Sequence, residues 1–148
     1  MKKFLIPIII LFISINTFSQ SKRDKVKALK VSFITERLEL TQEEAQKFWP
    51  IYNAYEDVTS KIKHEDLRKI RWEIKENIET LTNERADELV NQIEKATNKL
   101  YEEEVNLNKN LKKVIPPKKI ILLKIAEEDF KRKLFDQFKR MKQEGKRP

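Results

Sequence analysis

Residues 40–56 read LTQEEAQKFWPIYNAYE, and this stretch decides the fold. Thr41 is followed three residues later by Glu44, the spacing of a capping box, in which each side chain bonds to the backbone N–H of the other residue. Beyond this cap, large apolar side chains recur every three or four residues, as they do on one side of a helix. They are Ala45, Phe48, Trp49, Tyr52 and Tyr55. The stretch therefore predicts a helix that starts at Gln42 and buries an aromatic face.

This helix is the longest that the sequence predicts, running from about residue 42 to residue 79. Pro50 lies inside it and removes one backbone hydrogen bond. Because the apolar spacing continues past this proline, we expect a bend in the helix and not its end. The apolar stripe resumes at Leu67, although the polar stretch 61–66 could interrupt the helix.

Three further helices are predicted around it. One covers residues 21–39, where apolar side chains recur every seven positions. The next begins after Thr82, its N-cap, and carries the most regular apolar stripe of the chain. This stripe consists of Ala86, Leu89, Ile93, Ala96, Leu100, Leu107 and Val114. Pro116 and Pro117 then end that helix and start the last one, at about 118–143, because proline suits only the first turn of a helix.

The composition favours the same all-α fold. The chain has 148 residues, one glycine and no cysteine, and its hydrophobic fraction of 39% barely exceeds its charged fraction of 38%. A sheet needs glycines at turns and bulges, so a single glycine favours long helices. The high charge predicts extended helices that each bury only one stripe. We expect one all-helical domain, residues 20–148, without disulfides.

The N-terminus predicts export. Lys2 and Lys3 precede an apolar run of about a dozen residues (4–15), and small residues near Ser19 mark a cleavage site before Gln20. The run is shorter than the roughly 20 residues that span a bilayer as a helix. We therefore expect a signal peptide at 1–19 and a periplasmic protein; an uncleaved membrane anchor is the alternative. Without a cysteine, no lipid can be attached at the processed N-terminus.

The residues offer no recognisable catalytic chemistry. His64 is the only histidine, no cysteine accompanies it, and Met1 and Met141 are the only methionines. A phosphate-binding loop needs several glycines. Runs of acidic residues such as 102–104 and 127–129 usually form a solvated helix face. We expect a protein that is not an enzyme, with no catalytic residues, no cofactor and no metal.

The net charge indicates which kind of partner the chain attracts. Removal of Lys2 and Lys3 with the signal takes two from the 32 basic residues, which leaves 30 against 24 acidic ones and a net charge of +6. Because an exported protein meets little nucleic acid, we expect acidic polypeptides or an anionic membrane surface to be attracted instead.

One local pattern marks a candidate partner-binding patch. Trp72 lies roughly 200° around the helix from Ile70 and Ile74, so it points away from the apolar stripe. Arg68 and Lys75 are its neighbours on the same side, at i−4 and i+3. An exposed indole between two cations is a plausible protein-binding spot. The alternative is that Trp72 packs beneath another helix or a second subunit.

Two short stretches of the sequence resemble a motif of a known family. The sequence 40–44, LTQEE, resembles the LTxxQ motif of the periplasmic Spy/CpxP proteins, with Glu44 in place of the glutamine. A second copy of that motif precedes the last helix of the family and falls here on 115–119, IPPKK, which keeps the helix-starting proline of the pair Pro116 and Pro117. The family motif and helix cap thus comprise Leu40, Thr41, Glu44, Pro116 and Pro117.

A closer resemblance is to small exported Bacteroidetes proteins described as sensors of extracytoplasmic-function sigma factors. Residues 33–38, FITERL, and 40–56 look like the N-terminal signature of that group. Residues 112–135, KKVIPPKKIILLKIAEEDFKRKLF, look like its C-terminal signature. The resemblance covers nearly the whole of the chain after the signal peptide.

The resemblance implies a fold and two alternative functions. Spy/CpxP proteins are helical hairpins that dimerise into a curved cradle, so we expect an elongated, bent, four-helix antiparallel hairpin of this kind. The function implied is a non-enzymatic regulator of envelope stress sensing that binds a signalling partner; the alternative is an ATP-independent periplasmic holdase chaperone for unfolded proteins. The altered second motif and the lack of a Met/His-rich N-terminus argue against metal sensing.

A homodimer is expected as well, because a thin hairpin leaves apolar side chains of the third and last helices without cover from its own chain. These side chains are Ile93, Leu100, Leu107, Phe130, Leu134 and Phe138.

Overall fold

The computed structural model describes residues 22–144, and within this range the chain is helical throughout apart from three short connections. The elements are α1 (Lys22–Arg37), α2 (Gln42–Lys61), η1 (Ile62–Asp66), α3 (Leu67–Asn77), α4 (Asn83–Leu111) and α5 (Pro117–Glu144). The predicted all-α fold is confirmed. The predicted signal peptide, 1–19, lies outside the described residues.

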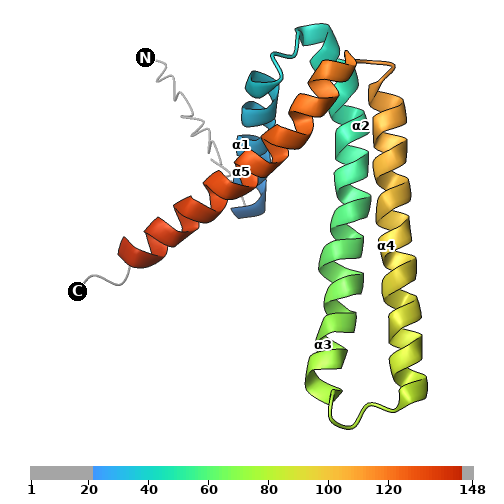
Figure 1. The fold of residues 1–148 in the computed structure, drawn as a ribbon. Coiled ribbons are helices and arrows are strands. Elements are labelled where there is room, and N and C mark those ends of the chain that lie inside the picture. Colours follow the sequence, from blue (N-terminus) through green and yellow to red (C-terminus); the bar gives the residue numbers. More distant parts are fainter. Residues whose placement is uncertain (1–21, 145–148) are drawn as a thin grey trace, which may run out of the picture.

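A long antiparallel hairpin forms one arm of the molecule (Figure 1). Its first half consists of α2, η1 and α3, which follow one another without a break. Its second half, α4, runs back beside them. Thr82 caps α4 as predicted, since its side chain accepts a 3.2 Å hydrogen bond from the Arg85 N–H. We call the turn between α3 and α4, residues 78–82, the tip of the hairpin.

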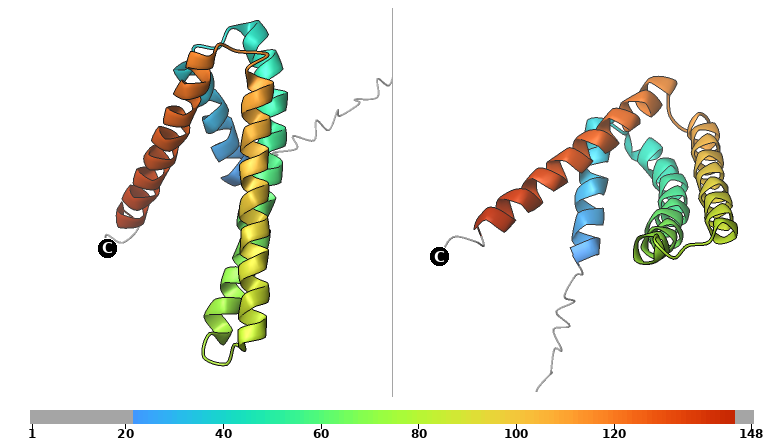
Figure 2. Two further views of the ribbon diagram at one scale, coloured as in Figure 1. Left: turned by 45° about the vertical axis from the view of Figure 1, so that its right-hand side comes forward. Right: turned by 60° about the horizontal axis from the view of Figure 1, so that its bottom comes forward.

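The second arm consists of α1 and α5, which run antiparallel and cross (Figures 1 and 2). At the crossing, the ring centroids of Phe33 and Phe130 are 5.6 Å apart. Arg37 Nη2 lies 2.9 Å from Asp129 Oδ2 nearby. From this point the two helices diverge, and the C-terminal half of α5 leaves both α1 and the hairpin.

The core lies where the two arms meet, at the end of the hairpin opposite its tip. Ten buried residues from α1, α2, the end of α4, α5 and the connections after α1 and α4 form one cluster: Ile34, Leu38, Phe48, Tyr52, Leu107, Leu111, Ile115, Ile120, Leu123 and Ala126. The predicted aromatic face of α2 lies in it. Phe48 and Tyr52 stack with ring centroids 5.4 Å apart and an interplanar angle of 13°.

The long helix continues through Pro50, as predicted, and changes its winding at η1. This single turn of π-helix occupies 62–66, within the polar stretch where an interruption was expected. The Leu67 N–H bonds to the carbonyl of Ile62, five residues back. Because a π-turn accommodates one extra residue, the apolar face that ends at Ile62 resumes at Leu67 and not at the exposed Asp66.

One expectation about the stripes is wrong. Leu107 and Phe130 were predicted to lack cover from their own chain, yet only 3% and 9% of their surfaces are exposed. Leu107 packs into the core, and Phe130 packs on Phe33 of α1. The dimer itself stays a prediction; of the other side chains expected to form it, Ile93, Leu100 and Leu134 are half-buried and Phe138 is exposed. Within residues 22–144, no helix is long and apolar enough to span a membrane.

Candidate protein-binding site

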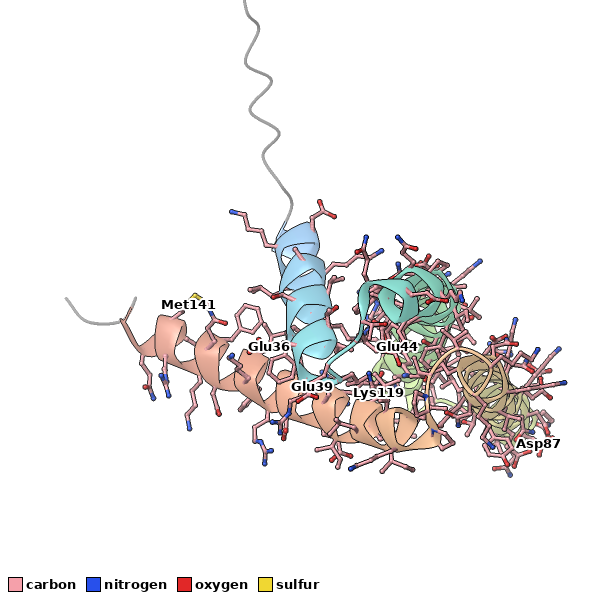
Figure 3. The ribbon with its side chains drawn as sticks, turned by 90° about the horizontal axis from the view of Figure 1, so that it is seen from above. Glu36, Glu39, Glu44, Asp87, Lys119 and Met141 are labelled. Atoms are coloured by element: carbon pink, nitrogen blue, oxygen red, sulfur yellow. The ribbon has the colours of Figure 1, made fainter. Side chains whose placement is uncertain are left out.

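Glu39, Glu44 and Lys119 lie together at one junction between the α1–α2 turn, α2 and α5 (Figure 3). The Glu44 N–H donates to Thr41 Oγ1 at 3.2 Å, and the Thr41 N–H donates to Glu44 Oε2 at 2.9 Å, so the predicted capping box is formed. Lys119 Nζ of α5 donates to the same Glu44 oxygen at 2.7 Å. The Lys119 ammonium, and then the Thr41 N–H, hold the pKa of the Glu44 carboxyl below its ordinary value.

The turn before the capping box has a left-handed residue. Glu39 has φ 47°, in the region that favours glycine. It ends α1 in a Schellman motif, in which the Leu40 N–H bonds to the Thr35 carbonyl at 3.1 Å and the Glu39 N–H bonds to the Glu36 carbonyl at 3.0 Å. Lys119 Nζ also reaches the Glu39 carbonyl, at 2.7 Å. The lysine thus fixes both sides of the α1–α2 turn.

The second motif copy supplies that lysine. Pro117 is the first residue of α5, as predicted, and the Lys119 N–H bonds to the Pro116 carbonyl at 2.9 Å. Leu40 packs against the core. The residues compared with the motif therefore cap, turn or pack a helix.

The predicted binding patch lies on the hairpin, well away from this junction. Trp72 of α3 has 65% of its surface exposed, and Arg68 and Lys75 beside it are also exposed. The alternative reading, in which Trp72 packs beneath another helix of this chain, is wrong. Ile70 is buried and Ile74 half-buried against the hairpin, as expected for the opposite face.

An open groove of about 630 Å³, here called the tip groove, lies beside Trp72. Its lining comes from α3, the tip and the start of α4. The residues are Lys69, Trp72, Glu73, Asn77, Thr80, Leu81, Thr82 and Arg85. Arg68 and Lys75 flank Trp72 on the other side of α3 and do not line the groove.

A bidentate ion pair holds the two walls of the tip groove together. Arg85 Nε donates to Glu73 Oε1 at 2.7 Å, and Arg85 Nη2 donates to Glu73 Oε2 at 3.0 Å. Arg85 Nη1 also reaches Glu88 Oε2 at 2.5 Å. The guanidinium lowers the pKa of the Glu73 carboxyl, mainly through the hydrogen bonds it donates. The two planar groups fix the spacing of α3 and α4 beside the indole.

Sequence reasoning missed Lys69 and Arg85. Lys69 lies three residues before Trp72 and so shares its side of the helix, which the spacing alone could have indicated. Arg85 is thirteen residues away along the chain, and only the pairing of α3 with α4 brings it to the groove. Ile78 adds an apolar side chain at the tip, 62% exposed.

The aromatic face of α2 is not available for binding. Phe48 and Tyr52 are fully buried in the core. Trp49 is half-buried and donates from Nε1 to Thr35 Oγ1 at 3.2 Å. Substitutions there would disturb the packing of α1 on α2 before they disturbed any partner.

Among the described residues, no three histidine, cysteine or acidic side chains are grouped so that they could hold a metal. Comparisons with models of known families, with curated proteins and with solved structures gave no match. The family resemblance of the motifs therefore stays a prediction.

Proposed function

We propose that this chain is an exported, non-enzymatic regulator of envelope stress sensing that binds one folded protein partner through Trp72 and the tip groove. The observation that carries the proposal is the exposure of Trp72, at 65%. Tryptophan is seldom left so exposed on a monomer, and it is the residue most enriched among those that dominate binding energy at protein interfaces.

The surroundings of the indole support a specific contact. Arg68, Lys69 and Lys75 place three cations around it, and the Arg85–Glu73 pair holds the groove beside it in one shape. A preorganised groove loses little conformational freedom on binding. A partner with an apolar side chain for the indole and carboxylates for the cations would fit this surface.

A holdase chaperone is the second candidate, and the spread of exposed apolar side chains favours it. Large apolar residues at least one-third exposed occur on every long helix of the described chain. They are Leu29, Val58, Trp72, Ile78, Val90, Tyr101, Val105, Ile121, Ile125, Phe135, Phe138 and Met141. Many weak apolar contacts over a basic surface would suit unfolded clients.

Co-purification from the periplasm separates the two. The tagged full-length chain is compared with Trp72→Ala and with the control Tyr101→Ala, which removes an equally exposed aromatic from α4 (69%). A regulator co-purifies with one stoichiometric partner, which Trp72→Ala loses and Tyr101→Ala retains. A mixed set of proteins, reduced by both variants, would overturn the regulator and support the holdase.

The charges around Trp72 allow a kinetic test once that partner is in hand. Replacement of Arg68 and Lys75 by glutamate should slow association, and the association rate of the unaltered protein should fall steeply as salt is added, because steering between exposed charges is screened over about 10 Å at 0.1 M salt. Trp72→Ala should mainly speed dissociation. Unchanged rates in both variants would place the contact elsewhere.

A further inference from the structure

A second surface, distinct from the tip groove, lies where α1 and α5 diverge. On α5, Leu134, Phe138 and Met141 follow Phe130 at steps of four, eight and eleven residues, so they share its face. Phe130 is 9% exposed, whereas Phe138 and Met141 are 51% and 49% exposed. The apolar face of α5 thus continues for about 16 Å beyond Phe130.

The face of α1 that carries Phe33 also extends beyond its contact with α5. Leu29 and Val26 precede Phe33 by four and seven residues and share its face. Phe33 meets Phe130 at the crossing, whereas Leu29 is 52% exposed. We call these two uncovered faces the α1–α5 wedge, made of Val26 and Leu29 on α1 and of Leu134, Phe138 and Met141 on α5.

The two faces of the wedge turn toward each other. Both helices leave the crossing on the same side and spread apart, as the views in Figures 1 and 2 agree. In Figure 3, Met141 lies on the side of α5 toward which α1 extends. A flat lipid surface cannot touch two faces that are turned toward each other, whereas a third helix can lie between them.

The charge around the wedge selects the kind of helix. Residues 131–143 of α5 contain six basic residues and one acidic residue, and 24–30 of α1 contain three lysines and one aspartate. An open groove of about 1120 Å³ lies beside the wedge, between α1 and α5, and none of the five wedge residues lines it. Its lining includes Phe33 together with four basic and four acidic side chains. Charges of both signs line that groove. The positive excess of residues 131–143 therefore comes from the basic residues outside it, Lys131, Lys139 and Lys142.

A second copy of this chain that docked through its own wedge would bring the same positive excess into this one. Like charges placed together across an interface are unfavourable, while opposite charges guide association. We infer that the α1–α5 wedge docks an acidic amphipathic helix of a partner protein, with the apolar stripe of that helix on Phe138, Met141 and Leu29. Helix docking into an apolar groove uses anchors at i, i+3, i+4 and i+7, which this length of face accommodates.

The test uses a synthetic helix as the probe. A leucine/glutamate peptide with leucines at i, i+3, i+4 and i+7 is titrated into the signal-cleaved protein, beside a peptide of the same composition with the stripe scrambled. The amphipathic peptide should bind at least tenfold more tightly than the scrambled one. Equal affinity would mean that charge alone attracts the peptide and would overturn the inference.

Matched variants locate the contact. Phe138→Ser and Leu29→Ser, one on each helix, should each weaken binding by about tenfold, the size of effect seen when an interface anchor is removed. Ile125→Ser is the control, because Ile125 is equally exposed (49%) on the opposite side of α5. It should bind normally, with helicity unchanged in all three. Equal losses in all three variants would contradict a site in the wedge.

Further measurements distinguish a docked partner helix from a lipid surface or a second copy, and distinguish the wedge from the tip groove. Binding of phosphatidylglycerol vesicles that depends on Phe138 but not on Leu29 would overturn it in favour of a lipid surface. Self-association in sedimentation that both variants abolish would overturn it in favour of a second copy. Trp72→Ala should leave peptide binding unchanged, so the failure of one site is distinguishable from the failure of the other.

Discussion

Lys119 Nζ lies 2.7 Å from Glu44 Oε2, and this ion pair joins the start of α5 to the N-cap of α2. The same ammonium holds the carbonyl of Glu39, so one side chain ties the start of α5 to the turn between α1 and α2. The two sequence motifs are 75 residues apart, yet they meet in one contact. This junction holds the start of α5 against the turn between α1 and α2 and against the first turn of α2.

The Lys119–Glu44 contact should make stability depend on pH. The pKa of Glu44 is lowered in the folded protein from an ordinary value of 4.5. Its contribution is therefore complete above that value and is lost as the pH falls through the lowered pKa. Glu44→Gln should melt at a lower temperature than the unaltered protein at neutral pH, and this gap should close in acid. Differential scanning calorimetry from about pH 7 to about pH 3 measures it.

Lys119→Gln provides the control for this pair. The double variant Glu44→Gln/Lys119→Gln should cost less than the sum of the two single variants, because both lose the shared ion pair. Each single variant also disturbs a hydrogen bond of its own, from the Thr41 N–H or to the Glu39 carbonyl. A gap for Glu44→Gln that widens in acid would contradict the assignment.

Thr41→Ala tests whether the cap is structural. Loss of an N-cap side chain costs about 1 kcal/mol, which lowers the melting temperature of a domain of this size by roughly 3–5 °C. Partner binding should be unchanged, because the cap lies at the core end of the hairpin and Trp72 lies near its tip. Full stability combined with lost binding would make the motif a recognition element instead.

Glu39→Gly should stabilise the protein. A residue other than glycine at φ 47° is strained by about 1 kcal/mol, and glycine relieves this strain at the C-terminal end of a helix. We expect the melting temperature to rise by a few degrees, whereas Glu39→Ala, which keeps a β-carbon, should gain nothing. Equal effects of the two substitutions would mean that the side chain, and not the backbone, decides the result.

Tyr52→Phe should destabilise the core. The Tyr52 hydroxyl donates to Glu127 Oε1 at 2.6 Å, and the tyrosine is 1% exposed. Burial, with the adjacent Glu127 carboxylate, raises the pKa of Tyr52 far above its ordinary value, so the hydroxyl stays a donor. Loss of a hydrogen bond to a charged group costs about 1.5–3 kcal/mol. Urea unfolding measures this cost, with the exposed Tyr101→Phe as a control that should not change it.

The helices could be predicted because their ends are set by neighbouring residues. Thr41, Thr82 and Pro117 each start a helix at the position expected from their own chemistry. The π-turn was not predicted, although it falls in the polar stretch 61–66 that was noted as a possible interruption of the helix. The step of five from Ile62 to Leu67, where three or four is the rule, is the signal that reveals it.

The surroundings of exposed side chains could not be predicted in the same way. A helical wheel shows that Trp72 faces away from Ile70, but only the register between α3 and α4 places Arg85 beside it. The same limit applies to Leu107 and Phe130. Their stripes were recognised, whereas the crossing of α1 over α5 and the closure of the core decide that they are covered.

The proposed regulator contacts its protein partner at the tip groove, and site-specific photo-crosslinking in living cells tests that contact. A photoreactive amino acid replaces Lys69 in the groove or, as a control, Tyr101 on α4. If the partner binds at the tip groove, position 69 gives one discrete crosslinked product and position 101 gives none. A broad mixture of products of similar yield from both positions would contradict it.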